Sequence, residues 1–199
     1  LEIDYQLIST LPEVLRSLSW KVTITIWKRK IISVEKGDKS TRCFGFAADI
    51  GTTKLAGFLL DLITGSTIAV ASKINPQVSM GEDIISRITY AVKNGPRGVQ
   101  DLQRAVTNGI NDLIDDCCMK ANIDFQDIFE FSFVGNTCMQ MNFLGISPRY
   151  LGLAPYSPAI GRGIDLPASS LGLRSHNNAN VHFLPVLGGF VGSDALAGI

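Results

Sequence analysis

The sequence predicts an α/β fold with a mixed sheet, preceded by a small α+β unit. Apolar runs over residues 44–50, 55–61 and 67–72 are separated by short turns, which is typical of an antiparallel meander of three strands. Helical and strand periodicities then alternate to the end of the chain. We therefore expect two domains, a small unit over residues 1–41 and an α/β domain over residues 42–199.

The composition is that of a globular protein with a buried core. Of the 199 residues, 46% are hydrophobic and 18% are charged, and the formal net charge is zero. No apolar run approaches the roughly twenty residues that span a bilayer, and no long basic run is present to attract nucleic acid. We therefore expect neither a membrane nor a nucleic-acid partner. The chain begins with Leu1 and lacks a signal-peptide pattern, so we expect a piece cut from a longer protein.

The cysteines and histidines form no pattern of metal ligands. The four cysteines match no zinc or iron–sulfur spacing, and the adjacent pair would form only a strained disulfide: Cys43, Cys117, Cys118 and Cys138. We expect reduced thiols in a cytoplasmic protein. His176 and His182 stand apart in the sequence and are expected to be structural.

The first unit should contain one helix and two short strands. Residues 10–13, Thr-Leu-Pro-Glu, have the pattern of a capping box, which predicts a helix that begins there and runs through Leu18. Residues 20–27 alternate, with Trp20, Val22, Ile24 and Ile26 on one face, and residues 31–34 form a second apolar run. A helix with two strands is too small to be stable alone, so this unit should pack against another part of the protein.

Helices and strands alternate after the meander. Acidic residues at 82 and 83 suit the start of a helix, and Asn94-Gly95-Pro96 suits its end. The next helix contains Asn108-Gly109, a pair that prefers turns. The expected elements are helices over 81–93 and 99–117, a strand over 129–134, a helix over 138–144, an irregular segment over 147–180, a strand over 181–186, and a helix that begins near 194.

Three meander strands followed by this alternation is the order of a ribonuclease-H-like fold. In an open sheet of this kind, the ends of the first, fourth and fifth strands lie at one edge, where ligands bind. Asp49, Asn136 and the loop over residues 188–194 should therefore surround one pocket.

The turn after the first strand, from Asp49 to Lys54, has the features of a phosphate loop. Gly51 permits backbone angles that let amide N–H groups converge on an anion. Thr52 and Thr53 add hydroxyl donors, Lys54 adds a cation, and Asp49 could hold Mg²⁺ through water. The loop resembles the first phosphate loop of the actin, heat-shock chaperone and sugar-kinase superfamily, and it is not a Walker loop. An ordinary tight hairpin is the alternative.

Five segments, taken in order, resemble the ATP-dependent reductive activators of corrinoid proteins. They are residues 49–54 (Asp-Ile-Gly-Thr-Thr-Lys), 75–77 (Asn-Pro-Gln) with 81–88, 135–139 (Gly-Asn-Thr-Cys-Met), 153–159, and 189–194 (Gly-Phe-Val-Gly-Ser-Asp). Residues 11–16 and 20–23 also resemble the middle domain of that family. The resemblance implies the first ribonuclease-H-like half of an actin-like ATPase domain, preceded by a middle or linker unit.

The resemblance also implies an activity and its cofactors. Such activators use ATP and Mg²⁺ to drive an uphill electron transfer, in which a [2Fe-2S] domain returns the cobalt of a corrinoid protein from Co(II) to Co(I). The ferredoxin cysteines and the second half of the ATPase domain are missing from this chain, so we expect the chain alone to be inactive. The implied catalytic residues are Asp49 and Asn136, with Asp49 also the metal ligand. The implied nucleotide-binding residues are Gly51, Thr52, Thr53, Lys54, Gly135, Thr137, Gly189, Gly192, Ser193 and Asp194.

Two other functions remain open from the sequence. A small-molecule kinase of the same superfamily would need a carboxylate base near the fourth strand, where Asn136 cannot take a proton. A non-catalytic nucleotide-binding scaffold needs no base.

Two segments also have structural alternatives. Glu82 and Asp83 could cap a helix with Arg87 paired to one of them, or this segment could contact a partner or position the nucleotide loop. Tyr156, with Pro155 and Pro158, could stiffen a loop or contact a partner.

Overall fold

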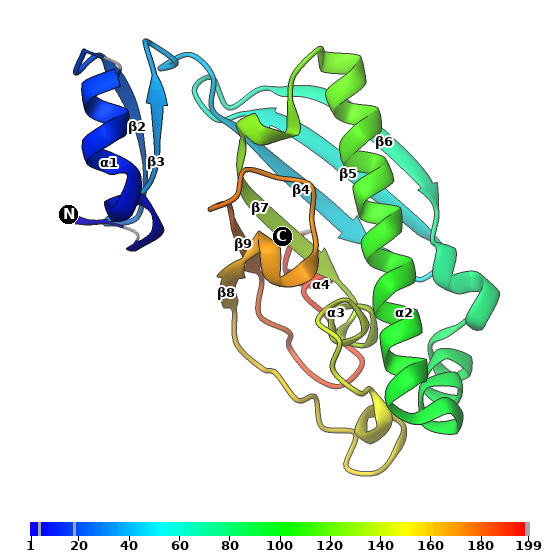
Figure 1. Ribbon diagram of the computed structural model, residues 1–199. Helices are drawn as coiled ribbons and strands as arrows, with labels where there is room; N and C mark the ends of the chain where they lie inside the picture. The colour runs from blue at the N-terminus through cyan, green and yellow to red at the C-terminus, as the bar shows by residue number, and fades with distance from the viewer. Residues whose placement is uncertain (4, 18, 198–199) are drawn as a thin grey trace.

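The computed structural model describes residues 1–3, 5–17 and 19–197, and it contains two sheets (Figure 1). The small N-terminal sheet has the order β1-β3-β2. The large sheet has the order β6-β5-β4-β7-β9-β8 and mixes parallel with antiparallel pairs. The chain is therefore a mixed α/β protein, as expected.

The N-terminal unit differs from expectation at its helix. Its elements are β1 (Glu2–Ile3), α1 (Tyr5–Ser17), β2 (Val22–Trp27) and β3 (Lys30–Lys36). The prediction of a capping box at Thr10 is wrong, because the helix begins at Tyr5 and the hydroxyl of Thr10 donates to the carbonyl of Leu7 inside it. The helix contains Pro12 in its interior, where proline has no N–H to donate and its ring crowds the carbonyl four residues earlier. The expected end at Leu18 lies outside the described residues.

The apolar face that the sequence predicts for residues 20–27, which contain β2, is largely exposed to solvent. Ile24 and Ile26 are 46% and 44% exposed, and the pairing register with β3 shifts between Thr25 and Ile26. The buried residues described in this unit are instead Ile32 and Ser33 on β3, the strand against which α1 packs.

The large sheet begins with the predicted meander. Strands β4 (Phe44–Ile50), β5 (Lys54–Asp61) and β6 (Thr67–Ile74) pair antiparallel. Strand β7 (Ile128–Gly135) then pairs parallel with β4, and β9 (Asn180–Phe183) pairs parallel with β7. The carboxyl ends of β4 and β7 therefore lie side by side.

Two strands of the described structure were not expected from the sequence, β1 in the N-terminal unit and β8 in the large sheet. Strand β8 (Ile164–Pro167) lies inside the segment predicted to be irregular, and it pairs antiparallel with β9. Four residues ending in proline carry too little periodicity to indicate a strand, and the pairing with β9 decides the conformation.

The helices that follow the meander lie close to their predicted positions. Helix α2 (Ile84–Ala121) contains a break at Gly95, whose φ of 59° interrupts the helical backbone where the sequence predicts the first helix to end. The Asp83 carboxylate accepts the Ser86 amide at 2.7 Å, and the Ser86 hydroxyl accepts the Asp83 amide at 3.1 Å. The other helical elements are α3 (Thr137–Phe143), α4 (Asp194–Ala197), and the 3₁₀ turns η1 (Pro76–Met80), η2 (Phe125–Asp127), η3 (Arg149–Gly152) and η4 (Ala168–Leu171).

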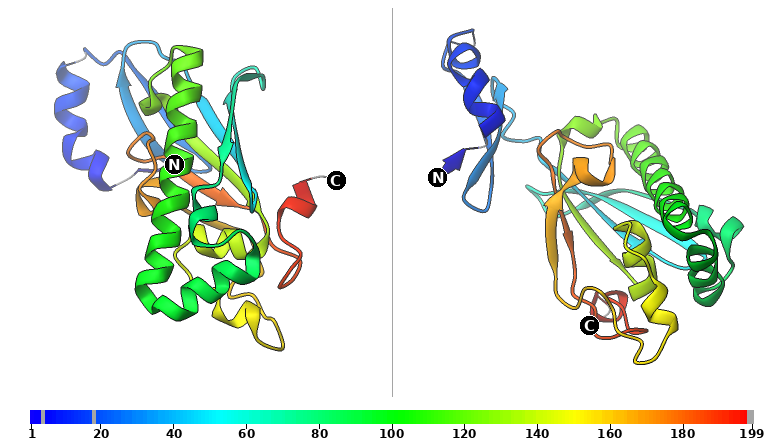
Figure 2. Two further views of the ribbon diagram at one scale, coloured as in Figure 1. Left: turned by 90° about the vertical axis from the view of Figure 1, so that its right-hand side faces the viewer. Right: turned by 60° about the horizontal axis from the view of Figure 1, so that its bottom comes forward.

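The main core lies between α2, α3 and one face of the large sheet (Figure 2). Side chains at three- and four-residue spacing on α2 are fully buried: Leu102, Val106, Ile110, Leu113, Ile114 and Cys117. They pack against the inward side chains of β4 and β5, and the phenyl rings of Phe133 and Phe143 meet edge to face at 5.0 Å.

All four cysteines are free thiols, and burial raises the pKa of Cys138 to about 12.

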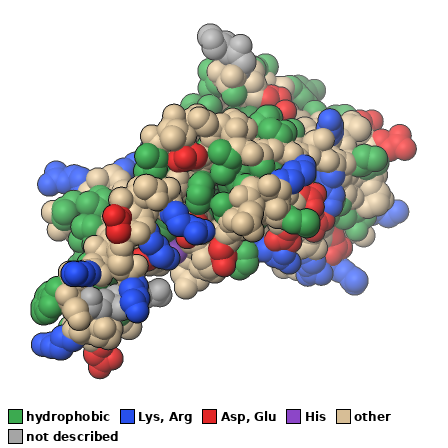
Figure 3. All heavy atoms as spheres, turned by 90° about the horizontal axis from the view of Figure 1, so that it is seen from above, with side chains coloured by type: hydrophobic (Ala, Val, Ile, Leu, Met, Phe, Trp, Pro, Cys, Tyr) green, Lys and Arg blue, Asp and Glu red, His purple; other side chains and the backbone are tan. Residues whose placement is uncertain are grey.

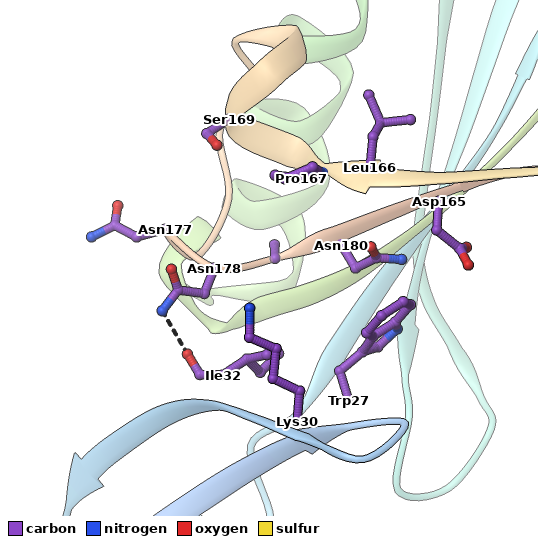
Figure 4. A pocket seen from close by; sticks show the side chains of 11 residues that line it. Trp27, Lys30, Ile32, Asp165, Leu166, Pro167, Ser169, Asn177, Asn178 and Asn180 are labelled. Atoms are coloured by element: carbon purple, nitrogen blue, oxygen red, sulfur yellow. Dashed lines mark hydrogen bonds between the residues drawn. The ribbon is translucent and has the colours of Figure 1, made fainter. Parts of the chain in front are cut away.

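The two units contact each other at the β8–β9 edge. The ammonium of Lys28 pairs with the Asp165 carboxylate, which also bonds Nδ1 of His182 at 2.8 Å. These partners hold the pKa of Asp165 below its usual value, with Lys28 the larger cause. The Asn178 amide donates to the carbonyl of Ile32 at 2.7 Å beside a cavity of about 400 Å³ (Figure 4). His182 therefore has a structural partner, in keeping with the expectation.

The surface carries intermixed charges. Figure 3 shows basic and acidic side chains interspersed over one face of the molecule, in line with the zero net charge. Within the described residues, every helix is too short or too polar to cross a bilayer.

The Gly109→Ala substitution should destabilise the fold, although alanine is the better helix former by about 1 kcal/mol. A Cβ at Gly109 would lie 2.7 Å from Cδ1 of Leu55 and 3.0 Å from the Pro76 ring, and Leu55 is fully buried. Overpacking of this kind costs about 1–3 kcal/mol, so the net effect should be destabilising. The measurement is the free energy of unfolding in urea. The neighbouring Asn108→Ala, at an exposed helical position, is the control and should leave stability equal or slightly higher. Equal stabilisation by both substitutions would contradict the tight contact.

Candidate functional site

The structure brings together the three segments that the sequence predicted to converge. Ile50 at the end of β4 is in register with Gly135 at the end of β7. The turn over residues 51–53 follows β4, the turn over 135–137 leads into α3, and the loop over 188–193 packs against both the start of α3 and the end of β7. These three segments form the candidate functional site.

Asn136 connects the first turn to the second. Its amide nitrogen donates to the Thr52 hydroxyl at 3.0 Å, and its amide oxygen accepts the Met139 N–H at 3.0 Å, which caps α3. Both ends of the side-chain amide therefore have protein partners. Next to it, the Thr137 hydroxyl donates to the carbonyl of Gly188 at 2.7 Å.

Ser193 fixes the third segment to the end of β7. Its side chain is fully buried, its N–H donates to the Gly135 carbonyl at 3.0 Å, and its hydroxyl accepts the Gly135 N–H at 3.1 Å. Only glycine fits at position 192, because a Cβ there would lie 2.3 Å from Cα of Asn136. The two backbones therefore touch directly. Gly189 is similarly close to the carbonyl oxygen of Tyr156, at 2.0 Å from an added Cβ.

The rim of this segment is apolar. The rings of Tyr156 and Phe190 lie 5.8 Å apart, and each residue is about half exposed. A cavity of about 370 Å³ is lined by Phe190, Val191, Gly192, Asp194 and Ala195. Tyr156 therefore supports the loop, and its contact with a partner stays a prediction.

Asp49 lies close enough to Asp194 to be affected by its charge. Asp49 alternates with the buried residues Ala48 and Ile50, so it projects from the sheet face opposite α2. Partial desolvation and, secondly, the negative charge of Asp194 raise the pKa of Asp49 above its ordinary value. Such a pair can supply oxygen ligands to a hard cation. Among the described residues, no group of three or more His, Cys, Asp or Glu side chains is arranged to hold a metal.

The side chains of Asn75 and Arg87 contact the turn over residues 51–53 from the side of β6 and α2. The sequence left open that residues 81–88 position this loop, and it assigned no role to Asn75. Asn75 donates its side-chain amide to the Gly51 carbonyl at 2.8 Å and its backbone N–H to the Thr53 carbonyl at 2.8 Å. Arg87 donates to the Thr52 carbonyl. A Cβ at Gly51 would lie 2.5 Å from the carbonyl oxygen of Lys54, so the turn is tight. Lys54 itself is exposed at the start of β5.

The structure also corrects the proposed surface pairing of Arg87. Its side chain is fully buried and donates to neutral acceptors, instead of lying beside Glu82 or Asp83 on the helix surface. The interruption of periodicity at Asn75-Pro76-Gln77 was the one available signal for this network, since both amide side chains are buried there.

The Asp194→Asn substitution should lower the pKa of Asp49 toward its ordinary value, because it removes a like charge and leaves the desolvation in place. The folded-state pKa of Asp49 lies above the unfolded one, so its ionisation destabilises the fold as pH rises through that pKa, and the substitution should lessen this loss. Carboxyl-carbon NMR titration measures the pKa directly. The control is Asp116→Asn, an exposed position on α2. An Asp49 titration that is identical in both variants would contradict the pairing.

Comparisons with known proteins agree with the resemblance seen in the sequence. Residues 44–199 match the family model described as RACo middle region, and residues 1–41 match the model described as RACo linker region. A curated relative, "Corrinoid activation enzyme RamQ" of Eubacterium limosum, is 36% identical over 169 residues, which are 85% of this chain and 28% of the relative.

A solved structure named "Reductive activator for corrinoid,iron-sulfur protein" matches with a TM-score of 0.89 at 34% identity. The match covers 98% of this chain and 32% of the solved chain. This chain thus spans about a third or less of the length of these two proteins. The family expected from the sequence is confirmed: the chain belongs to the RACo family, of which it carries the linker and middle regions.

Proposed function

We propose that this chain forms part of an ATP-dependent iron–sulfur reductive activator, which returns the cobalt of a corrinoid protein from Co(II) to Co(I). The observation that carries the proposal is the convergence of a hydroxyl-bearing turn, a second strand end and the Asp49–Asp194 pair at one edge of the sheet. The names of the two relatives supply the reaction class.

We also propose that residues 42–199 are the first ribonuclease-H-like half of an actin-like ATPase domain, with residues 1–41 as a separate small unit. Support comes from the strand order, in which three antiparallel strands are extended by two parallel ones, β7 and β9. In open α/β sheets, ligands bind outside the carboxyl ends of the parallel strands. The candidate site occupies that position.

The residues present fit the phosphates of ATP. The hydroxyl of Thr52 accepts a hydrogen bond from Asn136 and so keeps its own proton for an anion. None of the hydrogen bonds formed among the described residues uses the amide N–H groups of Gly51, Thr52 or Thr53. These donors are therefore available to phosphate oxygens, and exposed Lys54 adds a positive charge nearby.

The residues present also fit Mg²⁺. Partial desolvation and, secondly, the negative charge of Asp194 raise the pKa of Asp49, and a cation held near Asp49 through water would offset the like charge. When bound there, Mg²⁺ would neutralise phosphate charge. The other wall of the site is formed by close backbone approach and by the hydroxyls of Thr137 and Ser193, which bond backbone groups; its residues are Gly135, Thr137, Gly189, Gly192 and Ser193.

Asn136 favours this function over a small-molecule kinase. Its amide oxygen caps α3 and its amide nitrogen bonds Thr52, and a neutral amide cannot take a proton from a substrate. The role we propose for Asn136 is to orient the turn and not to act as a base. This suits an ATPase that switches conformation better than an enzyme that phosphorylates a sugar.

The electron must come from outside this chain. The three buried cysteines are separate thiols with raised pKa values, and Cys43 lies near the junction of the two units. We propose that a [2Fe-2S] domain elsewhere in the complete protein donates one electron, which the cobalt of the partner corrinoid protein accepts. The nucleotide site would then couple ATP to the conformation in which this transfer occurs.

In a complete protein that contains this chain, Asp49→Asn should abolish ATP-driven corrinoid reduction while the melting temperature stays nearly unchanged. A neutral amide keeps the shape of the carboxylate and loses the charge that positions Mg²⁺. The measurement pairs the ATP-dependent Co(II) to Co(I) absorbance change with thermal unfolding.

The matched control is Asp116→Asn, which should retain full activity because this residue lies on the exposed face of α2. Full activity in Asp49→Asn would rule out the magnesium role. Inactivity accompanied by a large drop in melting temperature would favour a structural role for Asp49 at the end of β4. ATP turnover that requires a sugar and does not change when the corrinoid protein is added would favour the kinase.

A further inference from the structure

Arg87 is a buried cation held by neutral groups. Its side chain is fully buried, and Nε donates to the Gly81 carbonyl at 2.8 Å while an Nη donates to the Gln77 side-chain oxygen at 3.1 Å. The other terminal nitrogen donates to the Thr52 carbonyl. Among the described residues, no carboxylate forms an ion pair with this guanidinium. Burying an unpaired charge is costly, so its retention calls for a reason.

Asn75 approaches the same turn from the end of β6. It is fully buried, and its two donors reach the carbonyls of Gly51 and Thr53 at 2.8 Å each. Its side-chain oxygen accepts the Gln77 N–H at 3.0 Å, which fixes the orientation of the side-chain amide. Together, Asn75 and Arg87 bind three successive carbonyl groups of the turn.

Holding the carbonyls determines where the amide groups point. In a planar trans peptide, the C=O and the following N–H point in opposite directions. With the carbonyls of Gly51 and Thr52 directed toward Asn75 and Arg87, the N–H groups of Thr52 and Thr53 are directed away from this network. No hydrogen bond among the described residues uses these two N–H groups.

We propose that Arg87 and Asn75 are positioning residues for an anion-binding turn, an inference that rests on the proposed function. They hold the turn so that its N–H groups face the phosphate chain of the nucleotide before it binds. Preorganised donors bind an anion without the cost of ordering the turn. The guanidinium also places a positive charge behind the turn in a medium of low dielectric, where its attraction for phosphate is strengthened.

The test measures binding of inorganic pyrophosphate by NMR, using the amide signals of Gly51, Thr52 and Thr53 in the 199-residue chain. The variants are Asn75→Leu and Arg87→Lys. The first removes the side-chain hydrogen bonds of Asn75, including the one to the Gly51 carbonyl. The second keeps the charge but loses the planar fork that reaches Gly81, Gln77 and Thr52 together. Each should weaken binding about tenfold or more, the size expected from losing a strong hydrogen bond.

Asn142→Leu is the matched control. Asn142 is as fully buried as Asn75, and its side-chain amide contacts Cys138 in α3 and not the turn. This variant replaces an equally buried side-chain amide away from the turn and should keep the pyrophosphate affinity of the unsubstituted chain. Melting temperatures are measured for all three variants, so that weaker binding is assigned to the turn only in a variant that stays folded during the titration.

The outcomes separate this inference from the proposed function. Weakened binding in every positioning variant that folds, with the control unchanged, supports the inference, and Arg87→Lys suffices if Asn75→Leu does not fold. Unchanged affinity in a folded positioning variant overturns it and leaves the anion site standing. If pyrophosphate does not shift the three amide signals in the unsubstituted chain, the anion site and this inference are both overturned.

Discussion

The parallel pairing of β4 with β7 is the constraint on which the site depends. It places Ile50 beside Gly135, residues that are far apart in the sequence, and therefore brings the turn after β4 next to the start of α3. Side chains alternate between the faces of a strand, so a shift of one residue would move Asp49 to the face covered by α2. The hydrogen bond from Asn136 to Thr52 and the docking of Ser193 on Gly135 both require this register.

A buried polar network connects the site to the helical layer. Asn75, Gln77 and Arg87 are fully buried between the meander and α2, and Gln77 donates to the Leu102 carbonyl at 2.9 Å. Buried polar groups are tolerated only when their hydrogen bonds are satisfied, so each partner restricts the position of the next. The network thus links the backbone of the turn to the first and middle parts of α2. A displacement of the turn would therefore disturb hydrogen bonds at the first and middle parts of α2.

Close backbone contact on one side and like charge on the other give the site two different walls. Gly192 and Ser193 touch the end of β7 through the main chain, which leaves no freedom for sliding. On the other side, partial desolvation and, secondly, the negative charge of Asp194 raise the pKa of Asp49. A cation bound near Asp49, as we propose for Mg²⁺, would offset this like charge without reorganising the backbone.

The sequence by itself determined the meander, the two helical segments separated at Gly95, the alternation that follows and the convergence of Asp49, Asn136 and the loop over residues 188–194. These features depend on local periodicity, turn residues and the general rule for open sheets. Only the tertiary structure decided the start of α1, the strand β8 and the inward direction of Arg87. A helix start depends on what precedes it, a four-residue strand depends on its partner, and a side chain near the start of a helix can turn to solvent or to the core. Contacts between residues that are distant in the sequence decide which carbonyl groups of the turn the Arg87 side chain bonds. A local sequence pattern contains no information about such contacts.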